Sequence, residues 1–301
     1  MELTTGENDS GRRLDRILRK ALNDYPLALI HRLIRRKKVL VDGKPAKAQD
    51  RLKFNAKITI LTLKEIPKTT LPVYPKHYPH LKILYEDETL ISVNKPSGLA
   101  VHGPDSLDTM VHSYLKGKIQ QSLSFIPGPL HRLDKPTSGI VVFSKSLEGA
   151  HRFSTAIREF NVQKTYLAIV KGTLKNEEIW QDELVRDHER KKTFVSENDQ
   201  TGSKTAITKV IPLAAKNGFS LIQVGITTGR THQIRAQAAF HKYPLLGDVK
   251  YGSEQSKTKS HKTTFFLHAW KLEFLEISIK APLPGAFLDK ITELFGDFKL
   301  F

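Results

Sequence analysis

The succession of strand-like segments after residue 80 constrains the fold of this chain most strongly. KTYLAIVKG (164–172), KTAITKVI (204–211) and FSLIQVGIT (219–227) are short and rich in the β-branched and aromatic residues that favour strands. Several such segments follow one another without an intervening helix, whereas parallel neighbours need a long crossover between them. We therefore predict an α+β domain with a mainly antiparallel sheet rather than a doubly wound fold.

Only a few segments of this region show helical periodicity. Phe153, Ile157 and Phe160 recur at helical spacing within residues 147–160, so we expect their side chains to face the core. THQIRAQAAFHKY (231–243) predicts a second helix behind a glycine turn. These helices would flank the sheet.

The start of the chain has a different pattern, with two short helices ahead of a hairpin. The segment RLDRILRKAL has apolar residues at helical spacing, and Pro26 can open a second helix. VLVDGKPA predicts a hairpin that turns at Asp-Gly, and ITI predicts a further strand. We therefore predict a small αα-β domain over residues 1–62.

Proline separates the two patterns. Four prolines fall between residues 67 and 79, and proline at this density favours an extended, semi-rigid spacer. We predict a linker over residues 63–80 and a second domain over residues 81–301. Within that domain the polar residues 253–262 predict a surface loop.

The charge of the chain points to a polyanionic partner. Lys and Arg number 48 against 31 Asp and Glu, which gives a net charge of +17. The first 60 residues alone hold 15 basic and 7 acidic residues, a net charge of +8. Such a field attracts nucleic acid, although a basic surface without a partner is the plain alternative.

Several chemistries are excluded or disfavoured. Cysteine is absent, which removes disulfides, thiolate metal sites and cysteine nucleophiles. Neither a GxGxxG nor a GxxxxGK[ST] motif is present, and the twelve histidines show no HExxH spacing. No apolar run approaches the roughly 18 residues of a membrane span, and the N-terminus has no apolar signal region. We expect a cytoplasmic protein that uses no metal and no cofactor and does not enter a membrane.

One carboxylate stands out. In HRLDKPTSG (131–139) Asp134 lies between Arg132 and Lys135, just before an apolar strand-like run. It could be a surface carboxylate paired with Arg132, which would contribute little. It could also be a nucleophile that a nearby cation keeps ionised. The local sequence leaves both open.

The wider sequence resembles the RluA-type pseudouridine synthases. HRLDKPTSG is similar to the signature of that family, and its other motifs are present in the expected order. They are ILYEDETLISVNKPSGLAVHG (83–103), QKTYLAIVKG (163–172), TGRTHQIRAQ (228–237), LLGDVKYG (245–252), LHAWKLEF (267–274) and APLP (281–284). The resemblance implies a mixed sheet with flanking helices around a central cleft. The segment GLAVHG favours the RluC-like branch.

The resemblance also implies site residues. Asp134 would be the catalytic aspartate, Tyr166 would lie against the uracil, and Arg235 would pair with the aspartate. Flipping a base out of a stem costs a few kcal/mol of stacking, so a side chain must fill the gap. The further residues implied at the substrate are Arg132, which would enter the stem, Ile234, which would pack on the base, and Arg230 and Thr137, which could bind phosphate.

The N-terminal segment resembles the small RNA-binding domain named after a primary-binding protein of the small ribosomal subunit. The resemblance lies in GRRLDRILRK and IHRLIRRKKVLVDGKPA. That family grips structured RNA through the corner of its two helices. The residues it implies in RNA binding are Arg12, Arg16, Arg35, Arg36, Lys37 and Lys38.

Taken together, the resemblances imply an enzyme that isomerises specific uridines of 23S ribosomal RNA, or of its precursor, to pseudouridine. We expect it to act as a monomer. A non-catalytic RNA-binding or ribosome-assembly protein on the same scaffold is the alternative. A cofactor-independent enzyme that acts on something other than RNA is a third reading, which the basic N-terminal segment disfavours.

Overall fold

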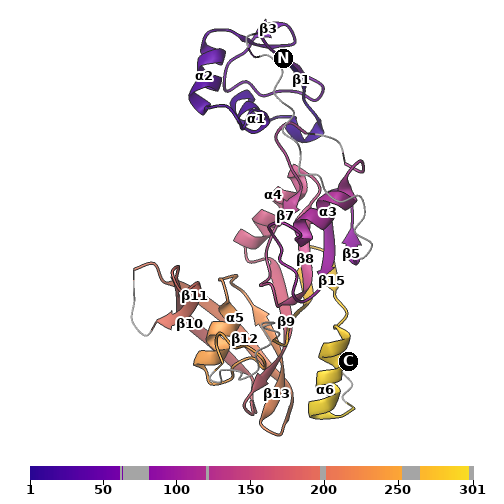
Figure 1. Cartoon of the computed structure of the whole chain (residues 1–301), viewed down its shortest axis with the longest axis vertical. Helices are drawn as coiled ribbons and strands as arrows, with labels where there is room; N and C mark the ends of the chain where they lie inside the picture. The colour runs from indigo at the N-terminus through magenta and orange to yellow at the C-terminus, as the bar shows by residue number, and fades with distance from the viewer. Residues whose placement is uncertain (62, 64–80, 120–121, 197–200, 253–264, 298–301) are drawn as a thin grey trace.

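Two separate sheets divide the chain. The computed structural model describes residues 1–61, 63, 81–119, 122–196, 201–252 and 265–297. A four-stranded sheet lies in the N-terminal domain at one end of the elongated molecule, and an eleven-stranded sheet forms the larger domain (Figure 1). The predicted linker lies, apart from residue 63, outside the described residues, as does the predicted loop over 253–262.

The N-terminal domain has the αα-β arrangement that the sequence predicts. Pro26 caps the second helix, and apolar side chains of both helices pack on the sheet in one core. The sheet order is β1-β4-β2-β3, and every pair is antiparallel. The elements are β1 (Glu2–Thr4), the short 3-10 helix η1 (Glu7–Asp9), α1 (Leu14–Ala21), α2 (Leu27–Arg35), β2 (Val39–Val41), β3 (Lys44–Pro45) and β4 (Lys57–Ile60).

The larger domain is a mixed sheet with four helices among its described residues. The path is β11-β10-β12-β13-β9-β14-β8-β6-β5, with β15 paired to β14 and β7 paired to β8. Its strands are β5 (Ile83–Glu86), β6 (Leu90–Lys95), β7 (Gly128–Pro129), β8 (Ser138–Ser144), β9 (Val162–Lys171), β10 (Glu178–Asp187), β11 (Lys192–Ser196), β12 (Lys204–Lys216), β13 (Phe219–Ile226), β14 (Leu267–Phe274) and β15 (Ile277–Lys280). Its helices are α3 (Leu107–Leu115), α4 (Leu147–Arg158), α5 (Gln233–Phe240) and α6 (Gly285–Phe295). The predicted α+β class with a mainly antiparallel sheet is confirmed.

A short parallel contact between β8 and β14 joins the two halves of this sheet. The register pairs are Ser138 with His268 and Gly139 with Ala269, and the other described pairs in the sheet are antiparallel. Gly139 has φ +112°, and a Cβ there would lie 2.2 Å from the Ala269 carbonyl oxygen. Only glycine permits this close approach, which lies five residues after Asp134.

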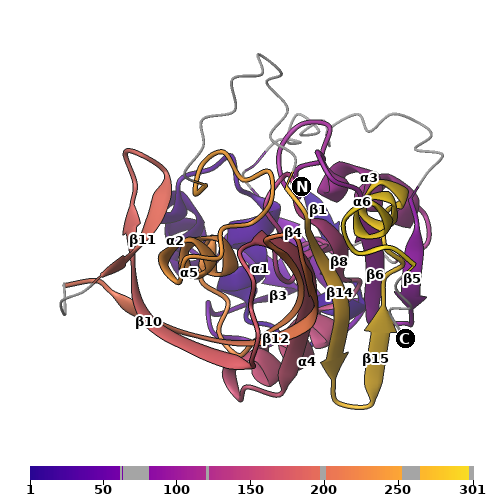
Figure 2. The ribbon, with the colours of Figure 1, turned by 90° about the horizontal axis from the view of Figure 1, so that it is seen from below.

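Alternation along the strands sets two faces. Tyr166, Ala168 and Val170 of β9 share a core cluster with α3 and α5, whereas Leu167 and Ile169 pack with α6. This is the period of two expected of a strand buried on both sides. The sheet curves strongly, and α5 lies on the concave side of β10 and β12 (Figure 2). Tyr166 and Arg235 are therefore carried by elements packed against one another.

One predicted core residue is wrong. The helix α4 ends at Arg158, and Phe160 follows it in the left-handed conformation, with φ 57° and 65% of its surface exposed. Helical spacing identified Phe153 and Ile157 as inward-facing but continued past the last helical turn. No helix in the described parts of the chain is both long and apolar enough to cross a membrane.

Candidate active site

The loop between β7 and β8 carries Asp134 and is fixed by its own backbone. The Thr137 N–H donates to the Asp134 carbonyl at 3.0 Å, and the Gly98 N–H donates to the Lys135 carbonyl at 2.9 Å. The buried Lys95 ammonium donates to the Lys135 carbonyl at 3.1 Å and to two carbonyls of its own loop. These hydrogen bonds to the Asp134 and Lys135 carbonyls fix the backbone at Asp134.

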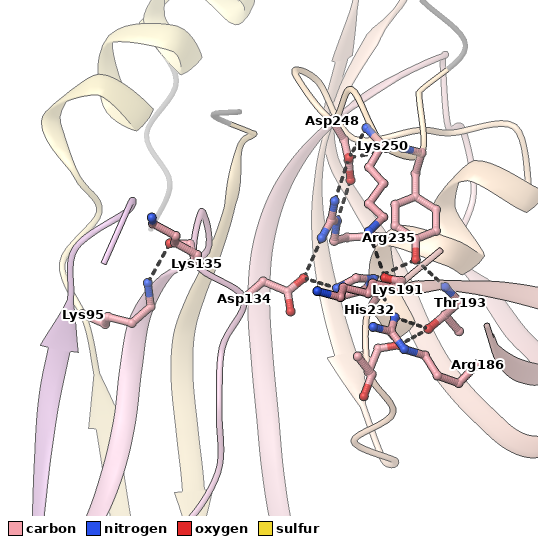
Figure 3. Close-up of polar contacts among 12 residues, drawn as sticks. Lys95, Asp134, Lys135, Arg186, Lys191, Thr193, His232, Arg235, Asp248 and Lys250 are labelled. Carbon is pink, nitrogen blue, oxygen red and sulfur yellow. Dashed lines mark hydrogen bonds and ion pairs between the residues drawn. The ribbon is translucent and has the colours of Figure 1, made fainter. Parts of the chain in front are cut away.

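The Asp134 carboxylate points away from this anchor, toward α5 (Figure 3). Arg235 donates from Nη1 to Asp134 Oδ2 at 2.8 Å. The same guanidinium donates from Nε and Nη2 to the two carboxylate oxygens of Asp248, at 2.7 and 2.9 Å. Asp248 therefore holds the arginine in a two-point contact, which leaves one edge of the guanidinium for Asp134.

Burial does not remove the charge of Arg235. Its side chain is 6% exposed and that of Asp248 is 0% exposed. Desolvation alone would lower the pKa of Arg235, but the contacts with Asp248 and Asp134 outweigh it and raise the pKa. Arg235 is therefore a buried cation fixed beside the Asp134 carboxylate.

His232 completes the surroundings of Asp134. It stands just before α5 in the left-handed conformation, φ 56°, with Nε2 3.6 Å from Asp134 Oδ2. Its Nδ1 lies 2.8 Å from the Tyr251 hydroxyl. Burial lowers the pKa of His232 to about 4, so the ring is neutral at pH 7. The positive partner of Asp134 is therefore Arg235 rather than His232.

Asp134 lies between two cavities. One, of about 360 Å³, extends toward His102 and Lys250. The other, of about 70 Å³, extends toward β9 and β13. Seven of the residues singled out in the sequence line the smaller cavity together: Arg132, Asp134, Thr137, Tyr166, Arg230, Ile234 and Arg235.

Tyr166 forms part of the wall opposite α5 in this cavity. The residue is 8% exposed and belongs to the main core cluster. Burial, and then the negative charge of Asp134, raise the pKa of Tyr166, so its phenol is protonated at neutral pH. A protonated hydroxyl beside a carboxylate can act as a proton donor.

Arg132 is arranged differently from Arg235. It is exposed and lines both cavities. Within the described residues it has no hydrogen bond or ion pair, whereas Asp134 pairs with Arg235. The simple surface pair between Arg132 and Asp134 is thus not formed, and the Arg132 guanidinium is available to a ligand.

Sequence reasoning missed three residues around Arg235. Asp248, His232 and Tyr251 lie inside the motifs that carry the family resemblance, but no pattern assigned them a role. Asp248 binds Arg235, and the Tyr251 ring lies 4.9 Å from the Arg235 guanidinium carbon. A buried arginine needs a buried carboxylate partner, and this requirement was the signal that could have identified Asp248.

The predicted RNA-binding residues of the N-terminal domain lie in three places. Arg35, Arg36, Lys37 and Lys38 are all exposed, at the last residue of α2 and in the turn between α2 and β2. Arg16 is exposed on α1. The Arg12 guanidinium instead donates to the Ser124 carbonyl and hydroxyl of the larger domain, at 3.0 and 2.9 Å.

Comparison with known proteins places this site in a family. The RNA pseudouridylate synthase family model matches residues 89–240, and the S4 domain model matches residues 12–58. Among solved structures, Human RNA Pseudouridylate Synthase Domain Containing 4 superposes with a TM-score of 0.60 at 24% identity, covering 71% of this chain and 92% of that one. That likeness supports the fold.

Curated relatives match over almost the whole chain. Ribosomal large subunit pseudouridine synthase D of Neisseria meningitidis serogroup A is 32% identical over 97% of this chain and 80% of its own length. Ribosomal large subunit pseudouridine synthase C of Vibrio vulnificus is 31% identical over 95% and 94%. Relatives named synthase C and synthase D both match over almost the whole chain, including its S4 domain. The chain therefore belongs to the RNA pseudouridylate synthase family and is an RNA pseudouridine synthase.

Proposed function

We propose that the enzyme isomerises specific uridines of 23S large-subunit ribosomal RNA, with Asp134 as the nucleophile. The observation that carries this proposal is the Asp134 carboxylate, held by Arg235 at 2.8 Å between two cavities. Such a carboxylate is oriented and open to a ligand. These are the requirements for covalent catalysis by an aspartate.

The reaction is an isomerisation and needs no other reactant. The bond between ribose C1′ and uracil N1 breaks, and a new bond forms between C1′ and C5. The proton of C5 leaves, and N1 gains one. Asp134 would attack either ribose C1′ or the uracil ring, and the released base would turn before it is rejoined.

The neighbouring side chains take complementary roles. Arg235 orients Asp134 and balances its charge, and Asp248 holds Arg235. Tyr166 lies against the uracil and can donate a proton, and Ile234 packs on the base. The free Arg132 would fill the space that the flipped uridine leaves in the stem, which offsets part of the lost stacking.

Phosphate contacts and the two domains complete the proposed binding of the RNA. Arg230, which is exposed, and Thr137, which is buried, both line the smaller cavity and would contact phosphate there. Residues 1–62 would form the RNA-binding domain, residues 63–80 the linker, and residues 81–301 the catalytic domain. The relatives named above are large-subunit enzymes. Relatives named C and D match about equally well, so the RluC-like branch stays a prediction.

The substrate prediction can be tested directly with purified enzyme and unmodified ribosomal RNA. Transcripts of 23S and 16S ribosomal RNA would be incubated with enzyme, and pseudouridines would be mapped by carbodiimide modification and primer extension. We expect defined positions in 23S RNA only. Modification of 16S RNA alone would contradict the target, and modification of neither would require the ribosomal precursor to be tested. Gel filtration during purification would test the expected monomer, and cell fractionation the cytoplasmic location.

A further inference from the structure

A second large cleft lies between the two domains. It has a volume of about 1060 Å³ and is lined by the loop before α1 and by α1 on one side. The other side is formed by the β5–β6 turn, by Lys118 and Ile119 just after α3, and by the first turns of α4. None of its described lining residues is shared with the cavities at Asp134. It exceeds the roughly 300–1,000 Å³ of typical small-molecule pockets.

The cleft is positively charged on both walls. Four arginines of the N-terminal domain line it, with two lysines and an arginine of the catalytic domain, against three glutamates. Two of these cations have carboxylate partners, since Arg13 pairs with Asp15 and Lys145 with Glu86, both at 2.7 Å. The excess positive charge suits a polyanion rather than an apolar or cationic ligand.

One guanidinium on each wall is available. Arg16 of α1 is exposed, and in the described residues nothing is bonded to its guanidinium. Arg152 of α4 is also exposed, and its one contact among the described side chains is with the Thr89 hydroxyl at 3.5 Å. Arginine presents a fork of donors that matches phosphate oxygens.

The two walls are held together by a buried carboxylate. Asp9 of the N-terminal domain is 0% exposed and accepts hydrogen bonds from the Ser122–Ser124 segment of the catalytic domain. The donors are the Ser122 hydroxyl at 2.7 Å, the Leu123 N–H at 2.9 Å, the Ser124 N–H at 3.0 Å and the Ser124 hydroxyl. These bonds lower the pKa of Asp9 against the effect of burial, so it is ionised at pH 7.

Three further contacts extend this connection. Arg12 binds Ser124, and the Asn8 side-chain oxygen accepts from the Leu147 N–H at the start of α4 at 2.8 Å. The Leu123 side chain packs against the core of the N-terminal domain. These contacts fix the distance between the two walls of the cleft.

We propose that this interdomain cleft is a second RNA-binding site, which holds phosphates of the substrate RNA away from the target uridine, and that Asp9 fixes its two walls in register. The inference rests on the proposed ribosomal RNA substrate. Residues of both domains contribute, so a long RNA would bridge them, whereas a short stem-loop would occupy only the site at Asp134.

Arg152→Ala tests the catalytic wall, with Arg158→Ala as its matched control. Arg158 is exposed on the same helix, contacts Thr155 and does not line the cleft. Binding would be measured by fluorescence anisotropy with a long 23S fragment and with a short stem-loop. We expect Arg152→Ala to weaken the long complex by about tenfold and to reduce the slope of log K against log salt by about 1. The stem-loop and the control should bind as wild type does.

Equal binding of the long fragment by Arg152→Ala and Arg158→Ala would overturn the proposal. So would an equal loss on the stem-loop, because the effect would then lie at the uridine site. Binding is measured without turnover. The wild type could bind the long fragment, lose affinity with Arg152→Ala, and yet modify no uridine. That result would contradict the proposed function but not the RNA-binding role of the cleft.

Asp9→Asn tests the connection, with Ser122→Ala as a milder change. The chain lacks cysteine, so Gln49→Cys and Ser154→Cys, both exposed, would carry a pair of spin labels on the two domains. We expect one narrow distribution of distances between the labels in the parent and a broad one with Asp9→Asn. In the Asp9→Asn background, Arg152→Ala should then cause no further loss of affinity for the long RNA. A narrow distance in both Asp9 and Ser122 variants would contradict the assigned role.

Discussion

At the scale of the residue, the site depends on one arginine between two aspartates. Asp248 is fully buried and binds Arg235 at two points, and Arg235 presents its remaining edge to Asp134. The direction of the Asp134 carboxylate is thus set by a residue that does not touch it. Asp248 is a positioning residue in this arrangement.

Replacing Asp248 should therefore impair catalysis. In Asp248→Asn the amide cannot accept both guanidinium bonds, so Arg235 shifts and Asp134 loses its alignment. A displacement of about 1 Å can cost roughly a hundredfold in rate, and we expect that loss in kcat. Single-turnover assays at saturating enzyme would measure it. Asp187→Asn removes the half-buried carboxylate partner of the exposed Arg190 and is the control. An unchanged kcat with Asp248→Asn would refute the positioning role.

A buried histidine should make stability depend on pH. His131 Nε2 accepts from the Val142 N–H at 3.1 Å, and burial, with the nearby charge of Lys164, lowers its pKa from 6.5 to about 3. The unfolded chain binds a proton between those values and the folded chain does not. Stability contributed at neutral pH is therefore lost as pH falls below 6.5.

His131→Gln should flatten this loss of stability. We expect the slope of the unfolding free energy between pH 4.5 and 6 to decrease by up to about 1.4 kcal/mol per pH unit, the value for one proton. Both tryptophans, Trp180 and Trp270, lie in the catalytic domain, so fluorescence in urea follows its unfolding. His151→Gln changes an exposed helical histidine and should leave the slope unchanged. An equal slope in both variants would contradict the assignment.

At the scale of the element, the parallel contact of β8 with β14 positions the loop that carries Asp134. The Ser138 hydroxyl lies 2.8 Å from His268 Nδ1, and the next residue, Gly139, lies against Ala269. The contact links the two halves of the sheet directly beneath the loop that carries Asp134. A small shift here would move Asp134 relative to Arg235.

Gly139→Ala should accordingly be strongly destabilising. The new Cβ would lie 2.2 Å from a backbone oxygen, and φ of +112° strains any other residue. Overpacking and backbone strain each cost about 1–3 kcal/mol, so we expect a loss of about 3 kcal/mol or more. Urea unfolding would measure it. Gly128→Ala, on the neighbouring strand β7, adds a Cβ with no atom within 4 Å and should be nearly neutral. Similar stability in both variants would argue against a required glycine.

The sequence predicted most elements because their periodicity is local. The hairpin after α2, the strand that carries Tyr166 and the helix that carries Arg235 follow from patterns within ten or so residues. Phe160 was misplaced because helical spacing does not mark where a helix ends. The strand order could not be read in this way, since the pairing of Gly139 with Ala269 joins residues that are far apart in sequence. The partners Asp248 and Asp9 were missed for the same reason.

At the scale of the whole molecule, exposed cations gather both on the N-terminal domain and around Asp134. The exposed cations Arg35 to Lys38 form one turn of the N-terminal domain, while the cations at the catalytic loop surround Asp134. Phosphate contacts release counterions, so binding through the turn should depend strongly on salt. Chemistry at Asp134 should not.

Neutralising the turn should separate these two effects. Changing Arg35, Arg36, Lys37 and Lys38 to glutamine should weaken RNA binding and reduce the slope of log K against log salt by up to about 4. The single-turnover rate at saturating RNA should remain that of wild type. Glutamine at the exposed Lys44, Lys47, Lys53 and Lys57 removes the same charge elsewhere in the domain and is the control. An equal loss in both variants would indicate general attraction rather than a binding face.

We propose Asp134 as the nucleophile that isomerises uridine. The most direct measurement follows tritium release from 23S ribosomal RNA labelled at uracil C5, because the new bond to ribose must expel that hydrogen. Wild type would be compared with Asp134→Asn, which keeps the shape and removes the charge. We predict release by wild type and none by Asp134→Asn at equal RNA binding. Release by both would contradict the assignment of the nucleophile.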